Sequence, residues 1–255
     1  MDSKFWKIAV VDHMAHGGTL NRKVPAEWKS LAYLRPEVVL DRLRRIATSG
    51  MLSGLPEDVQ TLRRRDLRQF LEGRQAALFC YGVGRALGVE VTFALCEKDD
   101  YDFVARYHID NSEIYVPVQL KELVPVKLNE KADLQKLLDS VSRKYPTSSD
   151  LVVAIHINRD ITDLRPAELR LPRGVGQLWF YGARDYTQER WMIAGDLLQD
   201  PNLVREFSYP LPQALIWEHI ANGPYVQRSV SWLVRNAVSD QYYSVALATF
   251  IFRRS

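Results

Sequence analysis

Cysteine is scarce in this chain of 255 residues, whose two cysteines are Cys80 and Cys96. They form neither a CxxC pair nor the repeated spacing of a disulfide framework. A small secreted domain held together by disulfides is therefore excluded, and the reducing cytoplasm is the expected location.

Long apolar runs and an excess of charge of one sign are also missing. No stretch reaches the roughly 18 uninterrupted apolar residues that a membrane span needs, so no membrane partner is expected. The N-terminus has no long apolar segment before a small-residue cleavage site, so no signal peptide is expected either. Lys and Arg number 34 against 31 Asp and Glu, which gives a net charge of +3. With a pI of about 8.8, this balance permits a nucleic-acid partner without requiring one.

The composition is that of an ordinary globular protein, with 47% hydrophobic and 25% charged residues. The length suits one large domain, or a core domain with additions. We divide the chain into an N-terminal extension of helix and strand (1–65), a core (66–160), and a sheet extension with C-terminal helices (161–255). The three parts are expected to pack as one domain.

Two stretches with alternating apolar and polar residues, 101–108 and 115–121, are typical of half-buried strands. The polar residues 110–113 between them suit a tight turn, so the two strands are predicted to form a hairpin. Side chains at every second position share one face of a strand. The alternation assigns these residues to the buried face: Phe103, Ala105, Tyr107, Ile114, Val116, Val118 and Leu120.

The other face of the hairpin gathers polar side chains at its open end. A turn centred between Asn111 and Ser112 places Asp102 opposite Lys121, with Gln119 on the same face. A carboxylate and amide oxygens are ligands for a hard divalent cation such as Mg²⁺. A lysine beside the ion can orient or deprotonate an attacking water and steady a phosphate oxygen. These groups together suit phosphodiester hydrolysis.

These residues and their flanking elements resemble the PD-(D/E)XK nuclease superfamily over roughly residues 66–160. Asp102 matches the first acid of the motif, and Gln119-Leu120-Lys121 matches its (D/E)-X-K. The resemblance implies an α/β, restriction-endonuclease-like core, in which a central mixed sheet is flanked by helices in the order helix, three strands, helix, strand. It also implies a Mg²⁺ or Mn²⁺ ion held by Asp102 and Gln119, Lys121 acting on the attacking water, and DNA as the partner.

In that superfamily, the helix before the hairpin often carries a Glu or Gln that completes the metal site. Glu72 is the matching candidate here, with Gln75 close behind it. Just before them, residues 61–68 are strongly basic. Such a run is either a solvated helix face or a surface that lies along a phosphate backbone.

Two positions depart from the superfamily pattern. Tyr101 stands where a proline precedes the first acid, and Gln119 replaces an acid, which removes one negative charge from the metal site. Three alternatives therefore stay open. Asp102 and Lys121 can be a solvated ion pair that contributes little. The domain can be a catalytically inactive nuclease fold used for nucleic-acid binding or assembly, or an unrelated α/β protein with a structural hairpin.

Periodicity and turn residues predict the remaining elements. A helix over 36–48 has Pro36 in its first turn and Gly50 after its end. The apolar run 150–157 is typical of a central strand buried on both faces. The other predictions are strands at 5–11, 89–95, 176–181 and 190–194, a helix from 55 onward to Gly88, helices at 130–144 (capped by Asn129), 212–222 and 228–237, and an apolar segment of either type at 242–252.

The histidines give a weaker signal. His13 and His16 are three residues apart, but no further His or Cys lies nearby in sequence, and Gly17-Gly18 favours a turn there. His156, at the end of the apolar run, is interpreted as a core residue. The C-terminal region, 161–255, is where target recognition or a homodimer contact would be placed.

Overall fold

The structure is a computed structural model that describes residues 24–96, 98, 100–109, 112–161, 164–200 and 202–210, together with the backbone of 225–235 and 242–253. The predicted strand at 5–11, His13, His16 and the predicted helix at 212–222 lie outside the described residues.

A seven-stranded mixed sheet forms the centre of the molecule, and its strands lie side by side in sequence order. Neighbouring strands are antiparallel except at the β3–β4 and β4–β5 pairs, which are parallel. A mixed central sheet flanked by helices is therefore confirmed. The strands are β1 (Val91–Leu95), β2 (Phe103–Ile109), β3 (Ser112–Leu123), β4 (Ser148–Ile157), β5 (Val175–Ala183), β6 (Arg190–Ala194) and β7 (Val204–Ser208).

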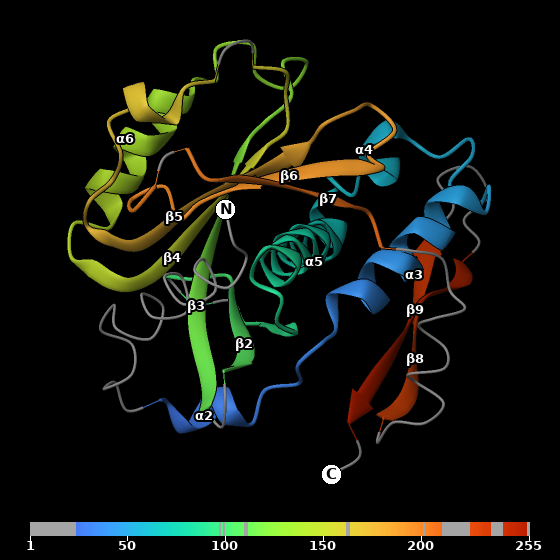
Figure 1. The fold of residues 1–255 in the computed structure, drawn as a ribbon. Coiled ribbons are helices and arrows are strands. Elements are labelled where there is room, and N and C mark those ends of the chain that lie inside the picture. The colour runs from blue at the N-terminus through green and yellow to red at the C-terminus, as the bar shows by residue number, and fades with distance from the viewer. Residues whose placement is uncertain are drawn as a thin grey trace.

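The sheet curls around one long helix (Figure 1). Helix α5 (Arg68–Leu87) contacts β1 at one edge of the sheet and also β6 and β7 at the other. Helix α6 (Leu134–Lys144) connects β3 to β4 and packs on the outer face. The remaining helical elements are α2 (Ala26–Lys29), α3 (Pro36–Thr48), α4 (Glu57–Gln60), and the 3₁₀ turns η1 (Arg65–Leu67) and η2 (Pro166–Glu168).

Each face of the sheet has its own hydrophobic core. All of the hairpin residues that alternation assigns to the buried face lie in the core around α5, so this prediction is confirmed. The second core packs α6, through Leu138 and Val141, against Val153 and Ile155 of β4. The near-continuous apolar run of β4 follows from this burial on both sides.

The predicted register of the hairpin is wrong by two positions. The β2–β3 ladder pairs Ile109 with Ser112 and Phe103 with Val118. Asp102 lies just outside this ladder, and its N–H donates to the Val118 carbonyl, so it is not opposite Lys121. Because side chains alternate with a period of two, a shift of two residues changes the partners but leaves every side chain on its predicted face.

The long helix predicted from residue 55 to Gly88 is broken in two. Helix α4 ends at Gln60, and Leu62 adopts a positive φ of 58°, which a right-handed helix does not allow. The basic run 61–68 is therefore no single helix face. Helix α5 then runs to Gly88, whose φ of 68° ends it.

Glycine inside α5 serves close packing. A Cβ on Gly82 would lie 2.7 Å from the ring of Phe207, and 3.3 Å from Ile193. The helix thus approaches β6 and β7 more closely than a larger residue would permit.

Two further predictions are corrected. Helix α6 begins at Leu134 rather than 130, because the carboxylate of Asp133 caps it by accepting the Lys136 N–H at 2.8 Å. The side chain of Asn129 instead accepts the Lys131 N–H in the preceding turn.

The predicted helix at 228–237 is wrong, because β8 (Tyr225–Arg235) pairs with β9 (Tyr242–Arg253) as an antiparallel two-stranded sheet. Valines at 226, 230 and 234 recur every fourth residue. That spacing fits one face of a helix and one face of a strand equally well.

Candidate active site

The site forms at the N-terminal end of β2, beyond which β3 continues without a partner strand on that side. Asp102, which directly precedes the ladder, donates its N–H to the Val118 carbonyl at 2.9 Å. Beyond it, the N–H of Leu120 is met by a side chain instead of a strand, because Asp102 Oδ2 accepts it at 2.6 Å. A buried strand must satisfy its backbone polar groups, and the carboxylate does so here.

The carboxamide of Gln119 completes this closure. Its Nε2 donates both to Asp102 Oδ2 and to the Leu120 carbonyl, the latter at 3.1 Å. Its Oε1 accepts from the Tyr145 hydroxyl at 2.5 Å. Gln119 is only 6% exposed and Tyr145 only 1%, so the amide is fixed on both sides. A carboxylate can only accept, which requires the amide nitrogen to face it.

Burial raises the pKa of the Asp102 carboxyl, because the charged form loses solvation. The Leu120 N–H and the positive charges of Lys121 and Arg68 oppose this rise. Asp102 is therefore a half-buried acid whose ionised form depends on the donors around it.

Lys121 lies on the same face of β3 as Gln119, two residues further along, and is half-buried. Burial lowers the pKa of its ammonium group, and the nearby charges of Lys144 and Arg68 lower it further, whereas Asp102 opposes them. A lysine whose charged form is disfavoured in this way is suited to exchange a proton.

Glu72 is linked to the site through its neighbour Arg68. Arg68 Nε donates to Glu72 Oε1 at 2.7 Å, and the Glu72 side chain is 15% exposed. Arg68 also acts electrostatically on Asp102 and Lys121. Gln75, almost one turn further along α5, is buried.

The structure thus brings together three of the predicted residues, Asp102, Gln119 and Lys121, and connects Glu72 to them through Arg68. In the described part of the chain, no group of three or more His, Cys, Asp and Glu side chains is arranged to hold a metal ion. Any ion here would depend on Asp102 together with amide and backbone oxygens.

Sequence reasoning did not assign Tyr145, Lys144 or the backbone of Leu120 to the site, and it named Arg68 only as part of the basic run 61–68. Tyr145 follows directly after α6 and touches Gln119 across 26 positions of sequence. A tyrosine after a helix is no specific signal, so only the folded chain identifies this contact. The Leu120 carbonyl becomes part of the site because β2 has ended there, and composition does not encode that.

The raised pKa of Asp102 gives a stability prediction. A carboxyl whose pKa is higher in the folded state than in the unfolded state stabilises the fold when it is protonated. This contribution is complete below the unfolded-state pKa of about 3.9 and is lost as the pH rises through the folded-state pKa. Asp102→Asn removes the charge and keeps an oxygen for the Leu120 N–H. In calorimetry at pH 7, we expect the Tm of this variant to equal or exceed that of the wild type. Near pH 4, any excess of its Tm over the wild-type Tm should disappear.

Asp66→Asn is the matched control with the opposite sign. The hydrogen bond from Arg64 lowers the pKa of the Asp66 carboxyl, so its contribution is present above the unfolded value and lost on acidification. This variant should be no more stable than the wild type at pH 7. A clear loss of Tm at pH 7 in Asp102→Asn would contradict the cost assigned to its charge.

Comparisons of the chain with family models, with curated proteins and with solved structures gave no match. Among the helices of the described residues, none has both the length and the apolar character to span a membrane. The function therefore has to be inferred from the geometry of the cluster around Asp102.

Proposed function

We propose that the protein is a metal-dependent nuclease that hydrolyses DNA phosphodiesters by attack of water. The observation that supports this most is the convergence of Asp102, Gln119 and Lys121 at the N-terminal end of β2. The order α5, β1, β2, β3, α6, β4 around these residues is also the order that the resemblance to PD-(D/E)XK nucleases implies.

The residues present are compatible with a divalent ion. The amide nitrogen of Gln119 lies between Asp102 Oδ2 and the Leu120 carbonyl oxygen, and oxygens of these two kinds are what Mg²⁺ and Mn²⁺ prefer. Asp102 would hold the ion through its carboxylate and Gln119 through its carboxamide oxygen. The Tyr145 hydroxyl can donate or accept, so it can support either end of the amide.

When bound, the ion would polarise the scissile phosphate and offset charge in the transition state. The remaining chemical roles would be performed by side chains of the protein. Lys121, with its lowered pKa, would orient the attacking water and accept its proton. Arg68, whose side chain is 73% exposed, and Lys144 would attract the substrate phosphates. Glu72 would hold Arg68 in place or bind a water.

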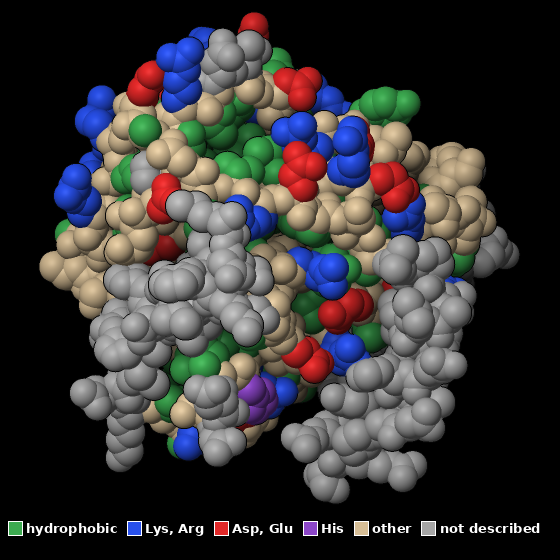
Figure 2. Space-filling view, in the orientation of Figure 1, with side chains coloured by type: hydrophobic (Ala, Val, Ile, Leu, Met, Phe, Trp, Pro, Cys, Tyr) green, Lys and Arg blue, Asp and Glu red, His purple; other side chains and the backbone are tan. Residues whose placement is uncertain are grey.

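The charges around the site favour local contacts with a few phosphates of the nucleic acid. On the face shown in Figure 2, Lys and Arg side chains are interspersed with Asp and Glu. Arg68 and Lys144 act electrostatically on Lys121, and all three of these cations interact with the charge of Asp102. Binding through a few phosphates would be weakened by salt with a shallow dependence.

A second candidate is an inactive nuclease fold that binds nucleic acid or assembles with other proteins. The observation that favours it is the state of Gln119, which replaces an acid and whose amide nitrogen is bonded to Asp102. Only one carboxylate then faces the ion, which weakens binding of a divalent cation.

Cleavage of supercoiled plasmid separates the two candidates. We expect nicking or linearisation in Mg²⁺ or Mn²⁺, none in EDTA, and a loss of at least about 100-fold in Asp102→Ala and Lys121→Ala. Lys136→Ala, an exposed position of α6, is the control and should cleave normally. DNA binding without cleavage in either metal would support the inactive module, and equal cleavage by all variants would exclude this site.

Restoring an acid at position 119 tests the metal directly. Gln119→Glu places a second carboxylate beside Asp102, and like charges in a buried site repel. We expect a lower Tm than the wild type without metal and a larger rise of Tm on adding Mn²⁺.

Gln199→Glu, which adds the same charge at an exposed position, is the control for this change. It should show neither the lower Tm nor the larger rise. A Gln119→Glu protein whose Tm responds to Mn²⁺ no more than that of the wild type would argue against an ion at this site.

A further inference from the structure

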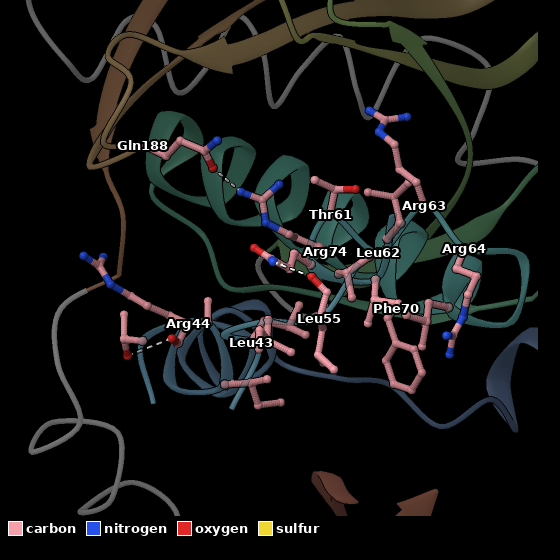
Figure 3. A pocket seen from close by; sticks show the side chains of 18 of the residues that line it. Leu43, Arg44, Leu55, Thr61, Leu62, Arg63, Arg64, Phe70, Arg74 and Gln188 are labelled. Carbon is pink, nitrogen blue, oxygen red and sulfur yellow. Dashed lines mark hydrogen bonds between the residues drawn. The ribbon is translucent and has the colours of Figure 1, made fainter. Parts of the chain in front are cut away.

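A pocket of about 950 Å³ lies on the α5 face of the sheet, opposite the face that carries Asp102 and Gln119. It is enclosed by α3, the segment 51–64, the first half of α5 and the turn between β5 and β6 (Figure 3). This size is within the range of about 300–1,000 Å³ for small-molecule sites. Much of its wall is apolar and includes Leu43, Ile46, Leu52, Leu55, Leu62 and Phe70.

Cationic side chains also line the pocket, and most of them are already paired. Their partners are carboxylates at its rim or just behind it, so these charges are balanced within the protein. The pairs are Arg44 with Glu189, Arg63 with Glu122, Arg64 with Asp66, and Lys127 with Glu57.

Arg74 differs from these cations. Its guanidinium donates to the neutral amide oxygen of Gln188, drawn as a dashed line in Figure 3, and lies 5.8 Å from the centre of the Trp191 ring. Among the described residues, no carboxylate forms an ion pair with it. Burial lowers the pKa of this half-buried guanidinium, which reflects the cost of a charge without a directly bonded counter-charge. The carboxylate of Glu122 opposes this shift, but it is paired with Arg63.

His156 also lines the pocket and has an unused polar atom. The residue is 3% exposed and stacks on Tyr181 at 5.0 Å and Trp191 at 5.8 Å. The prediction of a core histidine is confirmed as to burial, yet its Nδ1 has no hydrogen-bond partner. Burial and then the charge of Arg74 lower the His156 pKa to about 3, so the ring is neutral at pH 7. A neutral imidazole can carry its proton on Nδ1 and donate it.

We propose that this pocket binds a small molecule with an apolar, preferably aromatic, body and a single acidic head group that meets Arg74 and His156. The head group would supply Arg74 with a directly bonded counter-charge and Nδ1 with a hydrogen-bond partner. One negative charge is enough, because the other cations of the pocket are paired. The body would lie against the leucines and Phe70. This site is independent of the proposed nuclease activity.

Two fluorescent probes that differ only in the head group test the proposal. 1-Anilinonaphthalene-8-sulfonate carries a sulfonate, and N-phenyl-1-naphthylamine is the same body without it. In titrations of the full chain, we expect the sulfonate to bind at one saturable site and more tightly than the neutral probe. Arg74→Met should weaken the sulfonate about tenfold or more and leave the neutral probe within about twofold. His156→Phe, which keeps the ring stacking, should weaken the sulfonate in the same direction.

Three further variants serve as controls for these titrations. Arg65→Met removes an exposed charge of η1 that does not line the pocket, and should leave both probes unaffected. Leu55→Trp, at an exposed part of the wall, fills the pocket without removing a charge and should weaken both probes even if Arg74→Met fails to fold. Asp102→Ala should change neither, which keeps this test separate from that of the nuclease site.

Equal affinity of the wild type for the two probes would overturn the proposal. So would sulfonate binding that is unchanged in Arg74→Met, or binding of both probes that is unchanged in Leu55→Trp.

Discussion

The carboxylate of Asp102 takes over from a strand at the point where β2 separates from β3. The Leu120 N–H faces the side that β2 has left, and Asp102 Oδ2 accepts it at 2.6 Å. The Gln119 amide then binds the same carboxylate and the Leu120 carbonyl. A buried strand without these side chains would leave polar groups unsatisfied, at a cost of about 1–3 kcal/mol each. The groups that close the ladder are also the ones that would meet an ion.

The curled sheet separates two chemical environments. Its outer face, under α6, carries Asp102, Gln119 and Lys121, and Tyr145 ties this cluster to the end of that helix. Its inner face, around α5, carries the pocket with Arg74 and His156. Alternation along β3 and β4 produces the division, because successive side chains point to opposite faces. The basic run 61–68 is shared between them, since Arg63 and Arg64 line the pocket and Arg68 acts on Asp102.

Sequence patterns were most informative where a local period decides the structure. The predicted faces of the hairpin were correct although the predicted register was wrong by two residues, because a shift of two preserves the alternation of side chains. The prediction of a helix at 228–237 was wrong because the four-residue spacing of the valines there fits both the helical and the strand period. The hydrogen bond of Tyr145 to Gln119 and the electrostatic effect of Arg68 on Asp102 join distant parts of the chain, and no local pattern encodes them. The unpaired Nδ1 of His156 likewise follows from packing against Tyr181 and Trp191, which the sequence does not display.

A crystal soaked in Mn²⁺ and measured for anomalous scattering tests the central claim most directly. If the cluster is a metal site, an anomalous peak will lie against the Asp102 carboxylate, with the Leu120 carbonyl and the Gln119 side chain around it. If Gln119 Nε2 stays bonded to both oxygens and no peak appears within ligand distance of Asp102, the cluster only closes the strand ladder and the metal-dependent account is wrong.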